Sequence, residues 1–81
     1  MIVRVLYFAS LKDRTGTRED TLDVPPATDV AALWREVSAR HPRLKDVTMR
    51  PLVACDMVYA PWDRVLDGVT EVAFLPPVSG G

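Results

Sequence analysis

The first residues of the chain alternate in the manner of a β-strand. The segment "IVRVLYFA" at 2–9 is rich in β-branched and aromatic residues, and Arg4 marks the even-numbered positions as the outward face. The apolar residues Ile2, Leu6 and Phe8 therefore lie beside Arg4 on the outward face. The positions predicted to face the core are Val3, Val5 and Tyr7.

A short helical turn and a second strand follow. In "SLKDRTG" at 10–16, Ser10 is expected to cap the turn and Gly16 to end it in the left-handed conformation. Residues 18–24 alternate again, with Leu22 and Val24 predicted to point inward. The two prolines at 25–26 end this strand.

One clear amphipathic helix is predicted for "TDVAALWREVSARH" at 28–41. Thr28 is expected to be its N-cap, and Pro42 ends the helix before a loop. Apolar residues recur at the spacing of one helix face, which indicates a stripe that packs on the core. The stripe consists of Val30, Leu33, Trp34 and Val37.

The last third of the chain reads as extended pieces joined by turns. Residues 51–56 and 57–63 predict two short strands with a turn near Asp56, and "LDG" at 66–68 predicts another turn. The segment "TEVAFLPP" at 70–77 predicts the last strand. Its alternation gives one face Val72 and Phe74, and the other face Glu71, Ala73 and Leu75.

This order of elements predicts a single domain at 1–81 of the α+β class. One main helix covers one face of a mixed sheet of four to five strands, and the last strand returns to the middle. This is the outline of a β-grasp, or ubiquitin-like, fold. The uncovered face then carries an apolar patch, which is typical of a partner surface. The patch consists of Leu6, Phe8, Ala73 and Leu75.

Composition narrows the classes of function. The net charge is −1, with no basic stripe, which argues against nucleic acid as a partner. Cys55 is the only cysteine, so no internal disulfide forms, and a reducing cytoplasmic location is expected. The N-terminal apolar run is too short to cross a membrane and lacks a signal-peptide pattern.

The usual catalytic motifs are missing. One histidine and one cysteine, His41 and Cys55, do not form a metal site, so no metal is expected. Cys55 has no base beside it and reads as a buried thiol, and His41 reads as a structural residue at a helix end. No phosphate-binding glycine loop is present. The chain itself is therefore expected to bind no cofactor.

The ending "FLPPVSGG" is the remaining candidate for chemistry. Pro76 and Pro77 favour an extended exit from the sheet, and Gly80 and Gly81 fit a channel too narrow for side chains. The carboxylate of Gly81 becomes a good electrophile once it is converted to an acyl-adenylate. Residues 76–81 are therefore predicted to be a flexible, functional tail. The part of the tail that is predicted to enter a partner's active site comprises Pro76, Pro77, Val78, Ser79 and Gly80.

Three segments carry a resemblance to a known family. "RVLYFASLKDRTG", "DVAALWREVSARHP" and "DGVTEVAFLPPVSGG" resemble the MoaD-type small subunits of molybdopterin synthase, which are ubiquitin-like sulfur carriers of molybdenum cofactor biosynthesis. The resemblance implies a non-catalytic carrier subunit. Phe8 and Leu75 match the family's docking positions, and Val58 corresponds to a further contact. Cys55-Asp56 and "DGVTE" depart from the family's usual turn sequences.

The resemblance also implies a reaction cycle and its partners. A MoeB-type activating enzyme uses ATP to adenylate Gly81, and a sulfur donor protein supplies the sulfur of a C-terminal thiocarboxylate. The carrier then docks on the large, MoaE-type subunit in a heterotetramer. There its sulfur passes to cyclic pyranopterin monophosphate to build the dithiolene of molybdopterin.

The residues leave other classes open. A thiamine-pathway (ThiS-type) carrier shares the chemistry, although such chains are usually shorter and lack the Pro-Pro-Val approach to the final glycines. A ubiquitin-like modifier would instead use Gly81 to form an isopeptide bond with lysine. A binding module with an idle tail is a further class.

Overall fold

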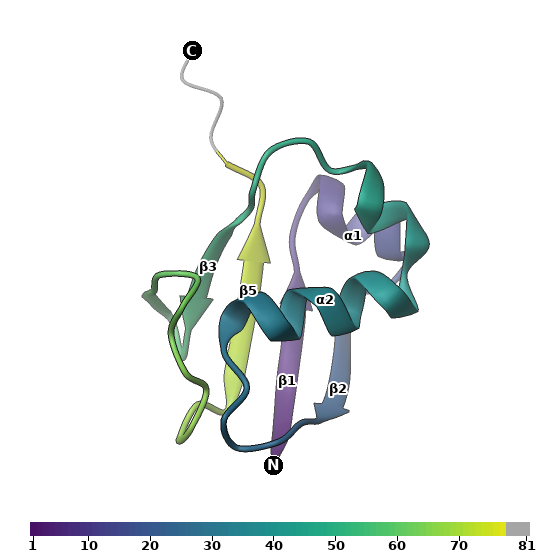
Figure 1. Cartoon of the computed structure of the whole chain (residues 1–81). Coiled ribbons are helices and arrows are strands. Elements are labelled where there is room, and N and C mark those ends of the chain that lie inside the picture. The colour runs from purple at the N-terminus through teal and green to yellow at the C-terminus, as the bar shows by residue number, and fades with distance from the viewer. Residues whose placement is uncertain (78–81) are drawn as a thin grey trace.

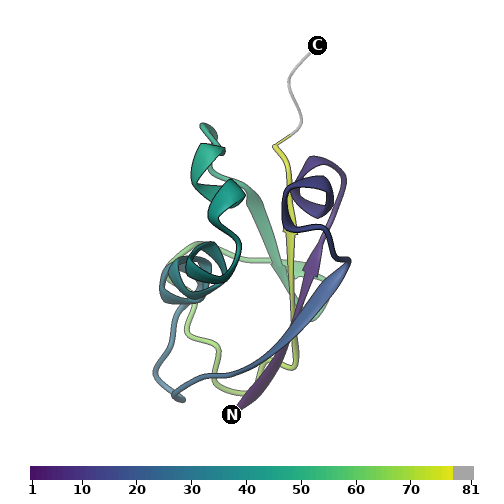
Figure 2. The same ribbon diagram turned by 90° about the vertical axis from the view of Figure 1, so that its right-hand side faces the viewer.

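A five-stranded sheet with one long helix across it forms the molecule (Figure 1). The structure is a computed structural model, and it describes residues 1–77. Figure 2 shows the sheet from the side, with the long helix and the 3₁₀ helix that follows it on one side, and the short helix near the N-terminus beside the end of the first strand. In chain order the elements are β1 (Ile2–Tyr7), α1 (Ser10–Thr15), β2 (Glu19–Asp23), α2 (Val30–Arg40), the 3₁₀ helix η1 (Pro42–Asp46), β3 (Leu52–Cys55), β4 (Val58–Tyr59) and β5 (Glu71–Leu75).

The strands lie in the order β2-β1-β5-β3-β4. β1 and β5 are parallel, with Leu6 opposite Ala73, and the other pairs are antiparallel. The last strand thus enters the middle of the sheet between β1 and β3, as the element order predicted. This mixed sheet with a single covering helix confirms the predicted β-grasp fold of the α+β class.

The core lies between the sheet and α2. Val5, Val72 and Phe74 from the sheet are fully buried, as are Leu33 and Val37 from the helix. Phe74 packs edge-on against Trp34, with ring centroids 4.9 Å apart. Trp34 lies in turn 5.8 Å from Trp62 in a second edge-to-face pair. Aromatic pairs of this kind add about 0.5–1.5 kcal/mol each beyond their buried area.

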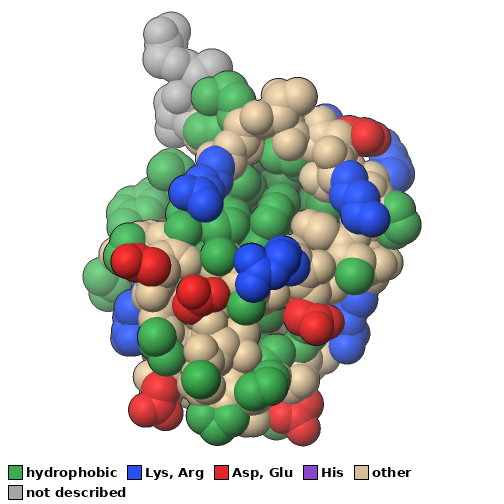
Figure 3. Space-filling model, viewed as in Figure 1, with side chains coloured by type: hydrophobic (Ala, Val, Ile, Leu, Met, Phe, Trp, Pro, Cys, Tyr) green, Lys and Arg blue, Asp and Glu red, His purple; other side chains and the backbone are tan. Residues whose placement is uncertain are grey.

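The faces of the first and last strands are as the alternation predicted. Val3, Val5 and Tyr7 point into the core, and so do the alternate residues of β5. On the helix side of the molecule, charged side chains of both signs surround an apolar hollow (Figure 3). The groove between α2 and the segment at 47–51 is lined in part by Trp34, Met49 and Trp62.

Both predicted helix caps differ from the observed ones. α2 begins at Val30, and its N-cap is Asp29, whose Oδ1 accepts a hydrogen bond from the backbone N–H of Ala32 at 2.8 Å. Thr28 was therefore the wrong residue, because the charged carboxylate next to it caps the positive helix end. Ser10 is the first residue of α1, and Ala9 occupies the N-cap position without a side-chain hydrogen bond.

The residues after α2 also differ from the prediction of a loop. Pro42 does end α2, but it opens the 3₁₀ helix η1, since a proline at the first helical position loses no hydrogen bond. Leu44 anchors this turn in the core. β5 ends at Leu75 rather than at residue 77, because Pro76 has no N–H to donate to a neighbouring strand.

The predicted turns are present. Gly16 has a φ of 73° and closes α1 with a hydrogen bond from its N–H to the carbonyl of Lys12. Asp56 and Met57 have φ values of 48° and 70°, so they form the two-residue turn between β3 and β4. Gly68 is left-handed at 80°. Within residues 1–77, no helix is long and apolar enough to cross a membrane.

Candidate functional site

The sheet face opposite α2 brings the predicted apolar residues together. Leu6 on β1 lies opposite Ala73 on β5, and Ala73 lies opposite Ala54 on β3. Phe8 follows the end of β1, and its backbone N–H donates to the carbonyl of Phe74 at 3.2 Å. We call this surface the apolar patch. It comprises Leu6, Phe8, Leu52, Ala54, Tyr59, Ala73 and Leu75.

Three members of the apolar patch were not predicted. Leu52 lies opposite Leu75 and is 40% exposed, while Tyr59 lies opposite Ala54 and is 70% exposed. The alternation in "LVAC" carried the signal, because Val53 and Cys55 are buried and their neighbours must face the other way. The pairing of β4 with β3, which brings Tyr59 in, depends on the turn at 56–57.

Val58 lies apart from the apolar patch. The two-residue turn pairs Val58 with Cys55, and directly paired residues of an antiparallel ladder point to the same side of the sheet. Since Cys55 points into the core, Val58 belongs to the helix side of the edge strand, where it is 69% exposed. Its role as a docking contact stays a prediction.

β5 carries the chain from the core to the root of the predicted tail. Phe74 is fully buried and the next residue, Leu75, lies in the apolar patch. Pro76 and Pro77 follow directly and line a groove of about 220 Å³ beside Ser10 and Arg14. The rest of the predicted tail lies outside the described residues, namely Val78, Ser79, Gly80 and Gly81.

One end of the sheet's open face carries charges instead of apolar groups. Arg4 on β1 forms an ion pair with Glu71 on β5, and its Nε lies 3.6 Å from the carboxylate of Glu19 on β2. Hydrogen bonding to Glu71 raises the pKa of Arg4, so the guanidinium is charged throughout the usual range. This polar end bounds the apolar patch on the side away from Phe8.

The two candidate side chains for chemistry, Cys55 and His41, are both held in the packed part of the domain. Cys55 is buried, and burial raises the pKa of its thiol, so it is protonated and shielded at neutral pH. His41 is bound through Nε2 to Asp20 at 2.6 Å. Among residues 1–77, no three metal-ligating side chains cluster.

A β-grasp sheet with an open apolar face beside its C-terminal strand defines a ubiquitin-like carrier or modifier class. The chain matches the ThiS family over residues 5–81. It therefore belongs to the ThiS family.

Full-length relatives sharpen this assignment. The human protein named "Molybdopterin synthase sulfur carrier subunit" is 39% identical over 98% of this chain and 93% of its own length. The Mycobacterium tuberculosis protein of the same name is 36% identical, over 98% of this chain and 96% of its own length. The resemblance to molybdopterin synthase small subunits is thereby confirmed.

Solved structures share the fold. SAMP1 from Haloferax volcanii aligns with a TM-score of 0.85 and 24% identity, over the whole of both chains. A chain from the protein–protein complex of subunits 1 and 2 of the Helicobacter pylori molybdopterin-converting factor aligns with a TM-score of 0.65 and 23% identity, again over both full lengths. At these identities the likeness shows the β-grasp fold alone.

Proposed function

We propose that this chain is the sulfur carrier subunit of a molybdopterin synthase. The observation that supports this most is the near full-length similarity, at 39% identity, to a relative with that name. The structure agrees with a carrier in one respect. β5 ends in the apolar patch at Leu75, so a partner that covers the patch also lies next to the root of the tail.

In the proposed cycle, the carboxylate of Gly81 is the group that is modified. It attacks the α-phosphate of ATP on a MoeB-type activating enzyme and forms an acyl-adenylate, with pyrophosphate as the leaving group. The terminal sulfur of a persulfide on the donor protein then attacks the acyl carbon and displaces AMP. A thiol reduces the resulting acyl disulfide, which leaves a thiocarboxylate on the carrier and a disulfide on the donor side.

The second half of the cycle takes place on the large subunit. The apolar patch docks on a MoaE-type partner, and residues 76–81 enter that partner's active site. The thiocarboxylate sulfur attacks a carbon of the pterin precursor, cyclic pyranopterin monophosphate, and displaces an oxygen substituent. Water then cleaves the bond between the sulfur and the acyl carbon, which leaves the sulfur on the pterin and regenerates the carboxylate of Gly81. Two such transfers supply the two sulfurs of the dithiolene. The Helicobacter pylori structure, a complex of subunits 1 and 2 of the molybdopterin-converting factor, supports a large-subunit partner.

The proposed division of labour gives this chain no catalytic side chains. ATP is bound by the activating enzyme and the pterin by the large subunit, while the carrier supplies the acyl group and the docking surface. Two carriers on a dimer of large subunits form the proposed heterotetramer. We place this cycle in the cytoplasm, where thiols and persulfides stay reduced.

Mass spectrometry of the intact chain tests the carrier function. The chain is incubated with its activating enzyme, ATP and a sulfur donor, and we expect the mass gain of one oxygen-to-sulfur exchange. Omission of ATP and deletion of Gly81 are the controls, and both should prevent the gain. No gain with an enzyme that demonstrably forms the adenylate would refute the carrier role.

The same experiment separates the alternatives. Addition of the large subunit and the pterin precursor should discharge the thiocarboxylate and form molybdopterin. Discharge only in the presence of thiazole-forming enzymes would assign the chain to the thiamine pathway. Lysine adducts of high mass, formed through Gly81, would assign it to the protein modifiers.

A further inference from the structure

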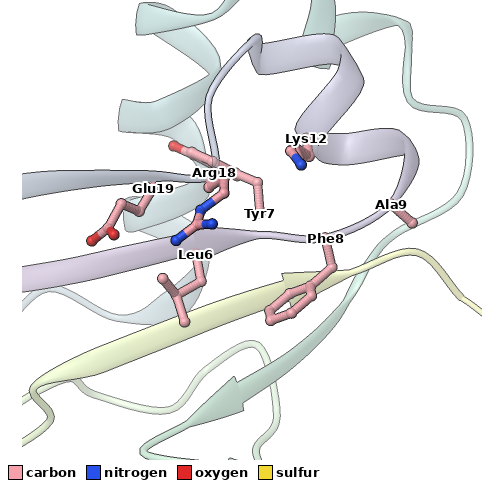
Figure 4. A pocket seen from close by; sticks show the side chains of 7 residues that line it. All are labelled: Leu6, Tyr7, Phe8, Ala9, Lys12, Arg18 and Glu19. Atoms are coloured by element: carbon pink, nitrogen blue, oxygen red, sulfur yellow. The ribbon is translucent and has the colours of Figure 1, made fainter.

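A notch of about 430 Å³ lies beside the apolar patch and shares two residues with it (Figure 4). Leu6 and Phe8 form its apolar side, and Figure 4 shows both side chains on the same side of β1. The opposite side is polar and comes from α1, from the residue just before β2 and from the first residue of β2. Its side chains are Lys12, Arg18 and Glu19.

The charge in this notch is unbalanced. Glu19 already faces a cation, because its carboxylate lies 3.6 Å from Nε of Arg4. Within the described range 1–77, neither Lys12 nor Arg18 forms an ion pair, and both side chains are exposed. The chain as a whole has a net charge of −1. The two cations are thus a local feature of this notch rather than part of a generally basic surface.

Backbone hydrogen bonds fix the positions of both cationic residues. The carbonyl of Arg18 accepts from the N–H of Tyr7 at 2.9 Å, which ties the residue just before β2 to the end of β1. The carbonyl of Lys12 accepts from the N–H of Gly16 at 2.9 Å, which closes α1. Both side chains therefore start from ordered backbone on either side of the Leu6–Phe8 strand end.

A partner that covers Phe8 must also border these two cations. Taking a charged group out of water without a counter-charge costs free energy, so a purely apolar partner surface fits the apolar patch but not the notch. A carboxylate placed there offsets this cost. It also steers the encounter, since complementary charges at an interface raise the association rate.

We propose that the notch receives an acidic side chain, Asp or Glu, from the large-subunit partner that covers the apolar patch. This inference rests on the proposed function. Lys12 and Arg18 then determine which partner surface is accepted, while Leu6 and Phe8 pack against the apolar atoms around the carboxylate.

Binding of the purified large subunit to full-length variants tests the inference. Isothermal titration compares the wild type with K12E, R18E and the double variant at low and high NaCl concentration. Each single reversal should weaken binding about tenfold or more at low salt. The loss should shrink at high salt, because the charges are then screened.

Two control variants make the result specific. Lys45→Glu reverses an exposed cation in η1, on the helix side, and should change the affinity little. Phe8→Asp disrupts the apolar patch itself and should abolish binding. The affected side chains are exposed, so far-ultraviolet circular dichroism and thermal unfolding should show an intact fold for every variant.

The outcomes separate this inference from the proposed docking. Loss of affinity in K12E and R18E but not in Lys45→Glu supports the notch inference. Rescue of these variants by an acid-to-lysine change in the large subunit would locate the acidic side chain of the partner. If Phe8→Asp abolishes binding while the reversals do not weaken it, docking stands and the notch inference is wrong. An equal loss of affinity for Lys45→Glu would also overturn the notch inference, because it would show that the overall charge of the chain, and not the notch, controls binding. If no variant affects binding, the docking proposal fails as well.

Discussion

Asp20 and His41 are joined across 2.6 Å, from Oδ2 of the carboxylate to Nε2 of the imidazole. The hydroxyl of Tyr7 donates to the same Oδ2 at 2.7 Å. An ionised carboxylate only accepts hydrogen bonds, so His41 is also a donor here. This cluster ties β1, β2 and the C-terminal end of α2 together at a half-buried point of the domain.

The first prediction concerns the stability that this cluster provides. Asp20→Asn should lower the free energy of unfolding at neutral pH by about 1–3 kcal/mol, because half-buried donors lose a charged acceptor. Urea denaturation followed by circular dichroism measures the loss. Asp67→Asn is the matched control, since Asp67 is exposed in a turn and makes no hydrogen bond among the described residues.

The pH dependence of this difference follows from the pKa of Asp20. Burial alone would raise the pKa, but hydrogen bonds from His41 and Tyr7 together outweigh burial and lower it below 3.8. A lowered folded-state pKa means that the stabilisation is present above 3.8 and is lost as the pH falls through the folded value. The gap between wild type and Asp20→Asn should therefore close in strong acid. A gap that does not change with pH would contradict the role of the ionised carboxylate.

This cluster also shows where sequence reasoning stops. The helix pattern placed His41 at the end of α2, which is correct, and assigned it to the helix dipole. Its partner Asp20 is 21 positions away on β2. That contact depends on how α2 crosses the sheet, and no local periodicity in the sequence specifies the crossing.

Alternation was a better guide to the sheet. Each strand has a period of two, so one charged residue, Arg4, was enough to assign both faces of β1. The same rule placed Ala73 and Leu75 on the open face. It did not place Tyr59, because a two-residue strand is too short to show a period and its facing depends on the turn. For the same reason the sequence did not show that Val58 lies outside the apolar patch, since its facing also depends on the turn.

The second prediction uses that turn. Met57 has a φ of 70°, a conformation that costs a residue with a side chain about 1–2 kcal/mol. Met57→Gly removes this cost and gives the Asp-Gly sequence that two-residue hairpin turns prefer. We expect the free energy of unfolding to rise by about 1 kcal/mol through the relief of strain. The greater conformational entropy of glycine in the unfolded chain reduces this gain.

A second methionine provides the control for this change. Met49 is also exposed but lies in a loop with no left-handed φ. Met49→Gly should therefore not stabilise the domain. Thermal unfolding of both variants gives the comparison, and equal effects at the two positions would argue against strain in the turn.

The third prediction contrasts two neighbours in β5. Phe74 is fully buried beside Trp34, so Phe74→Ala should cost about 3–5 kcal/mol of stability. Leu75 faces the apolar patch, so Leu75→Ala should cost about 1 kcal/mol or less. Its main effect should be weaker binding of the large subunit. Unfolding and binding are measured for each variant, and a large stability loss at Leu75 would place that side chain in the core instead.

The last prediction concerns which group of the chain carries sulfur. Cys55 is the only thiol, it is buried, and burial raises its pKa. We therefore expect iodoacetamide to modify Cys55 slowly in the folded chain and rapidly in urea, as measured by intact mass. Cys55→Ala should still gain the mass of one oxygen-to-sulfur exchange with the activating enzyme, ATP and the sulfur donor.

The matched variant keeps the thiol and removes the proposed acceptor. A chain that lacks Gly81 but retains Cys55 should gain no sulfur, because the thiol is shielded in the core and forms no acyl-adenylate. Circular dichroism should show both variants folded, so that loss of the gain reports on chemistry alone. Sulfur that appears on the Gly81-deleted chain and is lost with Cys55→Ala would move the carrier role from the C-terminus to the cysteine.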